Sequence, residues 1–388
     1  MHVLTLTPFY PSQEDERGGF VSEPLGEFAA LGLRSSVLAV RPVYKSLVFV
    51  SGTASPAAWV RYPALPGNLG LASAGRFLYL RVRNRVRQLH RENPVHILHA
   101  HAALPSGEAA RLLGRELGIP VVVTVHGLDA YFTEQIAGAL GAWCAWVCRR
   151  VYEHAGRVVC ISEQVRRCVL AGMPDLQNTE VIYNGVDPAI FSPGQSASAG
   201  DPVVASIGSL IPIKGHDVTL RAIAELGGEF PRLRCRIVGE GVELGRLQGL
   251  ARELGISERV EFLGRQTRVQ VAQVLRGSDI FALPSRYEGL GCAYLEAMAC
   301  GLPVIGCRGQ GIEEVIRHGE NGILLKEQDA GNAARALAAV LRTLLKNREM
   351  RETMGLAARR TVAEGYTLRQ QAQGLLSVFE RVRREGLA

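Results

Sequence analysis

Residues 288–306 read EGLGCAYLEAMACGLPVIG, and this stretch decides the fold class. The apolar runs IFALP before it and LPVI at its end are typical of buried strands in a parallel sheet, and the pattern between them is helical. Glu288 is therefore expected in the loop at the carboxyl end of a strand, where open α/β sheets bind ligands. Glu296 follows two helical turns later, roughly 12 Å along the axis at 1.5 Å per residue. This spacing suits one extended ligand held at two points.

Apolar runs alternate with helical patterns on both sides of this stretch, which predicts an α/β protein with parallel sheets built from β-α-β units. We expect six strands in the first half and five in the second, and helices almost throughout after Gly322. A chain of 388 residues is long for a single core. The predicted domains are 1–191 and 202–365, joined by a linker at 192–201 rich in Pro, Gly and Ser, with a final helix at 366–388.

Composition excludes several classes of protein. The net charge of +7 arises from 44 basic and 37 acidic residues, a diffuse excess that predicts no nucleic-acid partner but is compatible with anionic lipids or phosphorylated substrates. The eight cysteines do not form a disulfide framework, and several stand in apolar runs, where a thiol acts as a small hydrophobe. Packing is favoured over a zinc site for Cys144 and Cys148, which share a helix face. A reduced, cytoplasmic setting is expected.

The start of the chain, MHVLTLTPFYP, predicts a strand rather than a signal peptide, and no run approaches the ~20 apolar residues of a spanning helix. One segment nonetheless has a composition that is compatible with contact to a membrane surface. Residues 75–91, GRFLYLRVRNRVRQLHR, mix arginines with Phe77, Leu80 and Val82. Such a helix is either a solvated face or a peripheral contact with an anionic membrane at its inner face, and the solvated face is the favoured alternative.

Residues 288–306 resemble the E-x7-E signature of retaining glycosyltransferases of the group 1 type (family 4), with both glutamates, EAMA and GLPVI in register. The resemblance extends over nearly the whole chain and is looser at 45–93, in the acceptor-side domain. It implies a GT-B architecture, in which two Rossmann-like domains face an interdomain cleft and the C-terminal helix crosses back to the first domain. It further implies transfer of a hexose-type sugar from a nucleotide-diphosphate sugar, UDP-sugar favoured and GDP-sugar second, to a glycan or lipid-linked acceptor in cell-surface polysaccharide or glycolipid biosynthesis.

The second half carries further elements of this resemblance. SIGSLIPIKGHD (206–217) is similar to the family's G-R-L-x(n)-K-G element, whose cations hold the donor phosphates; Lys214 matches, but Ser209 stands at the arginine position. The turns around Gly239 and Arg265 resemble those beside the nucleotide base and ribose. By the same resemblance, Glu288 holds the sugar hydroxyls or steadies the oxocarbenium-like carbon, and Glu296 binds the ribose.

In the first half, a glycine pair precedes a helix in ERGGFVSEPLGEF, and TVHGLD brings His126 to the end of a strand. Glycines allow close approach of backbone to ligand, and the resemblance places the histidine near the donor sugar and acceptor. His99 and His101 alternate along a strand, so their side chains are expected on one face. Donor binding is expected from Gly18, Gly19, Ser209, Lys214, Gly239, Gly241, Arg265, Gly289, Leu290, Gly291 and Glu296, and catalysis from Glu288, His126 and Lys214.

The resemblance implies an enzyme without metal or other cofactor, since no aspartate-x-aspartate pair of the kind that holds a metal–diphosphate is present. Two other functions remain open: a nucleotide-sugar epimerase on the same fold, and a non-catalytic binding subunit of a polysaccharide assembly complex. Epimer formation without acceptor would favour the first, and measurable donor hydrolysis would remove the second. The motifs do not identify the nucleotide base, the sugar or the acceptor. They also do not distinguish front-face attack from double displacement.

Overall fold

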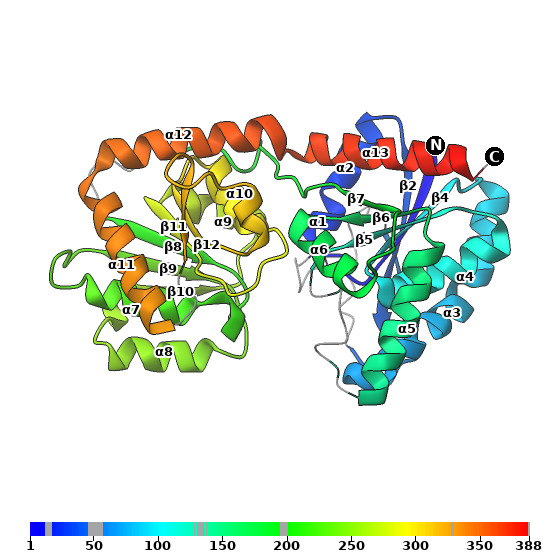
Figure 1. Cartoon of the computed structure of the whole chain (residues 1–388), viewed down its shortest axis with the longest axis horizontal. Coiled ribbons are helices and arrows are strands. Elements are labelled where there is room, and N and C mark those ends of the chain that lie inside the picture. Colours follow the sequence, from blue (N-terminus) through cyan, green and yellow to red (C-terminus); the bar gives the residue numbers. More distant parts are fainter. Residues whose placement is uncertain are drawn as a thin grey trace. The chain divides into compact units, whose positions relative to one another are not determined.

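The chain forms two compact units in the computed structural model (Figure 1), which describes residues 1–11, 18–45, 57–127, 129, 136, 138–194, 201–326 and 330–386, without the side chains of 67, 68, 330 and 331. Unit 1 comprises Met1–Asn184 and Leu368–Ala388, and unit 2 comprises Gly185–Thr367. The first boundary thus falls seven residues before the expected end of the first domain at 191. Most of the expected linker, residues 195–200, lies outside the described residues.

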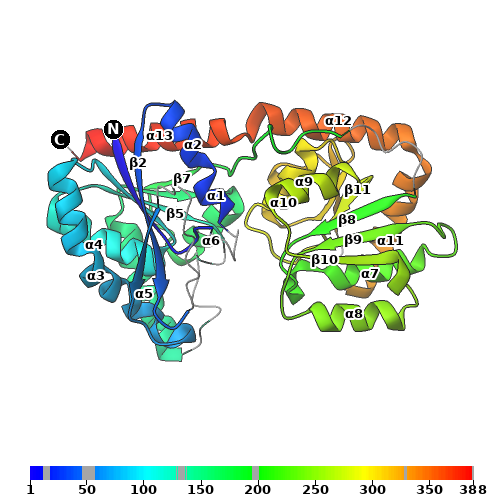
Figure 2. The same ribbon diagram turned by 180° about the vertical axis from the view of Figure 1, so that it is seen from behind.

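Unit 1 is built on a seven-stranded parallel sheet in the order β3-β2-β1-β4-β5-β6-β7. The central strands β1, β4 and β5 are buried along their whole length because helices cover both faces (Figure 2). The strands are β1 (His2–Thr7), β2 (Arg34–Pro42), β3 (Ala57–Tyr62), β4 (Ile97–His101), β5 (Val121–Val125), β6 (Arg157–Cys160) and β7 (Thr179–Val181).

The helices of unit 1 fall into two groups. On one side α3, α4 and α5 pack against one another, and on the other α2 contacts α13. Ser162 caps α6, where its hydroxyl accepts the Val165 N–H. The helices are α1 (Gly19–Ser22), α2 (Pro24–Ala30), η1 (Gly67–Gly70), α3 (Leu71–Glu92), η2 (Ala103–Gly107), α4 (Glu108–Leu117), α5 (Gly138–His154), α6 (Glu163–Gly172) and α13 (Leu368–Glu385).

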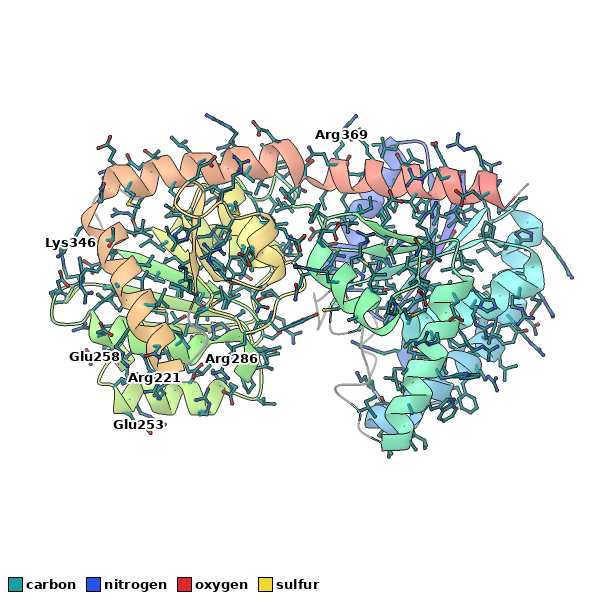
Figure 3. The ribbon with its side chains drawn as sticks, in the orientation of Figure 1. Arg221, Glu253, Glu258, Arg286, Lys346 and Arg369 are labelled. Carbon is teal, nitrogen blue, oxygen red and sulfur yellow. The ribbon has the colours of Figure 1, made fainter. Side chains whose placement is uncertain are left out.

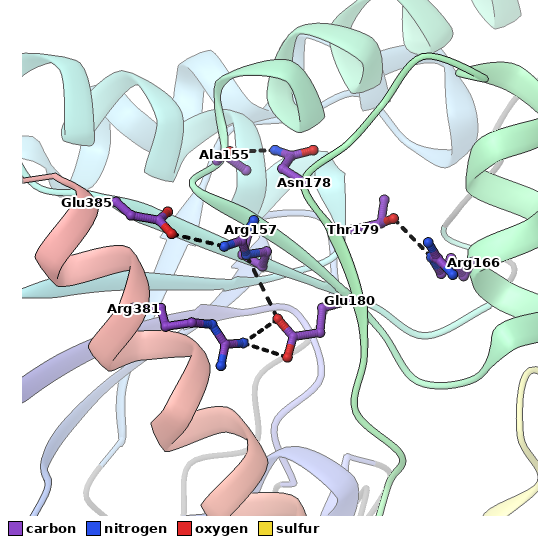
Figure 4. A network of polar contacts seen from close by, with 8 residues as sticks. All are labelled: Ala155, Arg157, Arg166, Asn178, Thr179, Glu180, Arg381 and Glu385. Carbon is purple, nitrogen blue, oxygen red and sulfur yellow. Dashed lines mark hydrogen bonds and ion pairs between the residues drawn. The ribbon is translucent and has the colours of Figure 1, made fainter.

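The last helix belongs to unit 1, as the predicted return of the C-terminal helix requires. Phe379 of α13 is fully buried in a core cluster with Phe28 of α2 and sheet residues that include Val122. At the rim of this contact, Glu180 of β7 pairs with Arg157 and Arg381, and Arg157 also reaches Glu385 (Figure 4). Apolar burial therefore carries this contact, since half-exposed ion pairs contribute little.

Unit 2 repeats the plan with six parallel strands in the order β10-β9-β8-β11-β12-β13. Its helix α9 begins with a capping box in which Thr267 and Gln270 satisfy each other's backbone N–H groups. The strands are β8 (Val203–Ile207), β9 (Arg234–Val238), β10 (Val260–Gly264), β11 (Ile280–Ala282), β12 (Val304–Cys307) and β13 (Gly322–Leu325). The helices are η4 (Pro212–Lys214), α7 (His216–Glu225), α8 (Leu244–Glu253), η5 (Ser257–Arg259), α9 (Arg268–Arg276), α10 (Cys292–Ala299), η6 (Gly311–Glu314), α11 (Ala330–Lys346) and α12 (Arg348–Gly365).

The two parallel sheets confirm the predicted fold class, with two strands more than expected. The sequence prediction missed β3, an edge strand whose alternating burial lacks the long apolar run of a central strand. It also missed β13, which forms the other sheet's edge, although α11, α12 and α13 confirm that the chain after this strand is mostly helical. Among the helices of the described part of the chain, none is long and apolar enough to cross a membrane.

Candidate functional site

Both sheets share one topological feature. The chain leaves the central strand to one side, then returns beside it, so that β1 and β4 are neighbours in unit 1 and β8 and β11 are neighbours in unit 2. At such a switch point the loops diverge and leave a crevice at the carboxyl ends of the strands, where doubly wound sheets bind ligands. The predicted residues His101, Lys214 and Glu288 all follow or end these four strands.

In unit 2, Lys214 and Glu288 meet at the switch point. Lys214 Nζ donates to Glu288 Oε1 at 2.7 Å, and Ser285 Oγ donates to the same oxygen at 2.9 Å. The Glu288 side chain is only 7% exposed and that of Lys214 is 20% exposed. A carboxylate so buried needs its partners, because an unpaired one would lose its hydration without compensation.

The backbone of Glu288 is fixed as well. Its N–H donates to Gln310 Oε1 at 3.0 Å, and its carbonyl accepts the N–H of Gly311 at 3.0 Å. A Cβ on Gly311 would lie 1.9 Å from the carbonyl oxygen of Gly289, so only glycine fits there. Gly291 takes a left-handed φ of 92° and α10 begins at the next residue. The helical rise assumed between the two glutamates therefore applies only from Cys292 onward.

Glu296 lies on the buried face of α10 and is 5% exposed, so it is not a solvated surface residue. It pairs with Arg268, the first residue of α9, whose guanidinium carbon also lies 4.6 Å from the centre of the Phe191 ring. The second predicted carboxylate thus has its own cation. The site contains two ion pairs, each of which joins a buried glutamate of the signature to a partly exposed cation.

The predicted glycine turns at Gly239 and Gly241 pack tightly against the backbone of the loop after β8. Gly239 has φ 141°, and a Cβ there would lie 1.9 Å from the carbonyl oxygen of Gly208, just before Ser209. A Cβ on Gly241 would come within 2.2 Å of the Leu210 carbonyl oxygen. The predicted Arg265 forms an ion pair with Glu240, 2.8 Å apart, in the turn between these glycines. The loops after β8, β9 and β10 therefore form one continuous rim beside Lys214.

In unit 1, the histidines form a buried hydrogen-bonded group. His101 Nδ1 lies 2.8 Å from His126 Nε2, and the two rings are stacked with centres 5.1 Å apart. His99 Nε2 lies 2.8 Å from Thr124 Oγ1. The His99 and His101 ring centres are 4.5 Å apart, as expected for side chains on one face of a strand. Burial lowers the pKa of His99 and of His126 to about 3, so these imidazoles are neutral near pH 7.

A small pocket opens against these histidines, lined also by Phe20 of α1 and by Asn184 and Gln371. His126 Nδ1 is buried and has no hydrogen-bond partner among the described residues. Its backbone N–H donates to Asp129 Oδ1 at 2.8 Å, and burial raises the pKa of Asp129 to about 7. An orphaned nitrogen beside a pocket is what a ligand hydroxyl would satisfy.

The predicted glycine pair lies beside this pocket. Gly18 has φ 109°, and a Cβ there would lie 2.6 Å from the carbonyl oxygen of Phe9. Gly19 begins α1, and the Phe20 ring after it lies 4.6 Å from the His126 ring, centre to centre. Residues 12–17, which precede the pair, lie outside the described residues. The chain thus needs glycine at position 18 to bring α1 over His126.

Sequence reasoning missed Ser285, Gln310 and Arg268. Ser285 stands three residues before Glu288, and a hydroxyl at that spacing from a loop carboxylate is a usable signal. Gln310 and Arg268 are 22 and 28 residues from their glutamates and are brought to them only by the sheet order. In the described part of the chain, no group of three His, Cys, Asp or Glu is placed to hold a metal ion. None of the eight cysteines forms a disulfide.

Comparisons with known proteins agree with this geometry. The family described as Glycosyltransferase Family 4 matches residues 25–190, and that described as Glycosyl transferases group 1 matches residues 190–361. The chain is 35% identical over 304 residues to a D-inositol 3-phosphate glycosyltransferase of Nocardia farcinica, covering 73% of this chain and 66% of that protein. It is 30% identical over 321 residues to one of Mycobacteroides abscessus, covering 76% and 68%. In several such relatives the match spans about three fifths of their length.

Solved structures show the same fold at low identity. Sucrose-phosphate synthase from Thermosynechococcus elongatus superimposes with a TM-score of 0.80 at 20% identity, over 99% of this chain and 100% of that one. Anabaena HepE in complex with UDP and glucose gives a TM-score of 0.75 at 20% identity, over 97% and 99%. With two Rossmann-like units, both family matches and these relatives, the chain belongs to the group 1 (family 4) glycosyltransferases of GT-B fold.

Proposed function

We propose that this protein is a retaining glycosyltransferase that moves a hexose-type sugar from a nucleotide-diphosphate sugar to a glycan or lipid-linked acceptor. A UDP-sugar is the favoured donor and a GDP-sugar the second. The proposed setting is the cytoplasm, in cell-surface polysaccharide or glycolipid biosynthesis, with peripheral contact at the inner face of the membrane. The observation that carries the proposal is the buried Lys214–Glu288 pair at the switch point of unit 2.

The proposed chemistry follows from charge. Breaking the anomeric C–O bond builds positive charge on the sugar carbon and negative charge on the departing diphosphate. Glu288 is the carboxylate that would face the sugar, and Lys214 is the cation that would face the phosphate oxygens. Their contact at 2.7 Å holds both groups in place before the donor arrives, which lowers the reorganisation needed in the transition state. The N-terminus of α10 at Gly291, with Gly289 and Leu290 before it, would add backbone N–H groups.

Ser209 leaves one expected cation absent from the loop after β8, and Arg286 is our candidate to replace it. Its backbone N–H donates to the carbonyl of Ile213 at 2.8 Å, which places residue 286 beside the residue before Lys214. The Arg286 side chain is exposed and is labelled on unit 2 in Figure 3. A guanidinium in this position would offer two parallel N–H donors to a phosphate.

Glu296 would bind the ribose hydroxyls, with Arg268 holding its carboxylate in position. The turns at Gly239, Gly241 and Arg265 would border the base and ribose. In unit 1, the orphaned Nδ1 of His126 would form a hydrogen bond with a sugar hydroxyl. Gly18 and Gly19 would allow the ligand to approach the backbone closely. We propose that no metal takes part, with Lys214 and the helix N-terminus in its place.

The relatives favour a polar acceptor without fixing it. Several of those matched by sequence are named D-inositol 3-phosphate glycosyltransferases, so a phosphorylated polyol belongs in the acceptor screen beside glycans and lipid-linked sugars. HepE was crystallised with UDP and glucose, which supports UDP as the first nucleotide to try.

The first test is thermal unfolding with UDP, GDP or ADP, for the wild type and Glu296→Gln. A nucleotide at 100 times its dissociation constant adds about 2.7 kcal/mol of stability. We expect one nucleotide to stabilise the wild type strongly and the variant less; no shift with any of them would remove the donor-binding basis of the proposal. Retention is then read from the anomeric configuration of the product by NMR, where an inverted product would exclude it.

A further inference from the structure

Unit 1 exposes large apolar side chains together with arginines on two neighbouring helices. Phe77 and Leu80 of α3 are 44% and 54% exposed, and Trp143 and Trp146 of α5 are 43% and 50% exposed. Two such tryptophans on one helix of a folded unit need an explanation, since burying an aromatic ring is strongly favourable. We call these four residues, with the arginines of α3 and Arg150, the α3–α5 surface.

The two helices are adjacent. They run beside each other in Figures 1 and 2, and the Cys144 thiol of α5 meets the backbone of Ala72 at the start of α3. On α3, the side chains of Leu78 and Val82 point inward and are fully buried. The exposed Phe77 and Leu80 therefore lie on the outer face of this helix.

The charge of the surface is strongly positive. Helix α3 carries six arginines and a single acidic residue, Glu92. One of these arginines is neutralised locally, because Arg87 pairs with Glu116 of α4. The others are Arg76, Arg81, Arg83, Arg85 and Arg91, of which all but Arg83 are exposed. On α5, Arg150 lies 4.5 Å over the Trp146 ring, so cation and aromatic ring share one place, with Glu153 the nearby acidic residue.

Tryptophan flanked by arginine is the composition that binds the interface of an anionic bilayer. The amphipathic indole favours the headgroup level, and each nearby arginine adds attraction to anionic lipid. A protein partner would more commonly meet an apolar centre depleted in charge. We propose that the α3–α5 surface docks unit 1 onto a bilayer that contains anionic phospholipids. The inference deepens the proposed function and rests on it, since it names the surface that would make the proposed membrane contact and bring a lipid-linked acceptor within reach.

The test is flotation of the full-length protein with vesicles of phosphatidylcholine alone or of equimolar phosphatidylcholine and phosphatidylglycerol. The wild type is expected to float with the anionic vesicles and not with the neutral ones, and to detach as salt is raised. Arg81→Gln/Arg85→Gln should weaken binding about 25-fold, at about fivefold per arginine. Trp143→Ala/Trp146→Ala should also lose binding, but with an unchanged dependence on salt.

Matched controls lie on unit 2. Arg221→Gln/Arg252→Gln removes the same charge from exposed positions, and Leu356→Ala removes an exposed apolar residue; both should float like the wild type. Equal binding by the α3–α5 variants and the controls would overturn the proposal, as would binding that ignores lipid charge. A change of solution mass from dimer to monomer in the tryptophan variant would assign the surface to a second copy instead. Stabilisation by nucleotide, measured on the same samples, distinguishes failure of this surface from failure of the transferase proposal.

Discussion

Lys214 Nζ lies 2.7 Å from Glu288 Oε1, so a buried ion pair joins the loop after β8 to the loop after β11 across 74 residues of sequence. The sequence resemblance gives these two residues separate roles, phosphate cation and sugar carboxylate. Their contact means that neither role is independent of the other. Removing one partner changes both the charge and the position of what remains.

We expect Glu288→Gln to reduce kcat about 10²- to 10³-fold, the range for loss of one preorganised electrostatic group. Lys214→Gln should both lower kcat and weaken donor binding, because the ammonium would face the phosphates. Steady-state kinetics with the donor identified by nucleotide screening measure both. Wild-type turnover in Glu288→Gln would show that this carboxylate is not in the reaction.

The same pair makes a stability prediction. Lys214→Met leaves a buried carboxylate with Ser285 as its remaining side-chain partner, and should cost about 1–3 kcal/mol of unfolding free energy. Adding Glu288→Gln should recover part of that loss, because no buried charge remains. The control is Arg317–Glu320, also 2.7 Å apart but 61% and 57% exposed, whose removal should change stability by less than about 1 kcal/mol. Equal losses at both pairs would contradict the role of burial.

Arg268 should matter to nucleotide binding through Glu296. Arg268→Gln removes the cation that holds the buried carboxylate, so nucleotide affinity should fall about tenfold, or roughly 1.4 kcal/mol. Arg268→Lys keeps the charge but not the planar group stacked on Phe191. Its nucleotide affinity should therefore lie between those of the wild type and Arg268→Gln. Calorimetric titration with the stabilising nucleotide measures all three. Unchanged affinity in Arg268→Gln would separate Glu296 from the nucleotide.

The turn at Gly239 allows a matched glycine comparison. Gly239→Ala places a Cβ 1.9 Å from a carbonyl oxygen at φ 141°, so it should displace the loop after β8 and weaken nucleotide binding and stability together. Gly249→Ala, on the open face of α8, meets no atom within 4 Å and should raise stability by about 0.5–1 kcal/mol. Denaturant unfolding of the two variants decides this, and a harmless Gly239→Ala would show that the loop is free to move.

The sequence sufficed for the core of the fold and for single site residues, and it failed where the decisive information lies far along the chain. The central strands were predictable because burial on both faces makes them continuous apolar runs, as in β8, whereas edge strand β3 has no such run. Glu288 was predictable from its loop, but its partner Gln310 was not, because only the packing of η6 beside that loop brings the amide there. The exposure of Trp143 was equally out of reach, since an apolar helix pattern does not state which face is covered.

Acid should destabilise unit 1 through its buried histidines. Burial lowers the pKa of His126 from 6.5 to about 3, so between these values the unfolded chain binds a proton that the folded chain does not. The contribution to stability is complete above pH 6.5 and falls by about 1.4 kcal/mol per pH unit below it. His99 has the same sign. Burial raises the pKa of Asp129 from 3.8 to about 7, so its contribution has the opposite sign. The stability that it contributes is lost as the pH rises from 3.8 to about 7.

Burial also lowers the pKa of His101, so the three histidines outweigh the single aspartate and the unfolding free energy should rise between about pH 4 and 6.5. His126→Gln should reduce this slope by about 1.4 kcal/mol per pH unit relative to the wild type. Denaturant titrations across the window, on the wild type and on His126→Gln, measure the slope. An unaltered slope in His126→Gln would mean that this imidazole is protonated in the folded protein.

The return of α13 to unit 1 should depend on apolar burial rather than on its ion pairs. Phe379 is fully buried, 6.0 Å from the Phe28 ring and 5.1 Å from the His99 ring, so Phe379→Ala should cost about 3–5 kcal/mol. Glu180→Gln removes the acceptor of Arg381, but these side chains are 31% and 38% exposed, and the loss should stay below about 1 kcal/mol. Thermal unfolding at low and high salt compares them: only the Glu180 effect should shrink with salt. If Glu180→Gln lost as much unfolding free energy as Phe379→Ala, the ion pairs rather than apolar burial would hold α13 on unit 1.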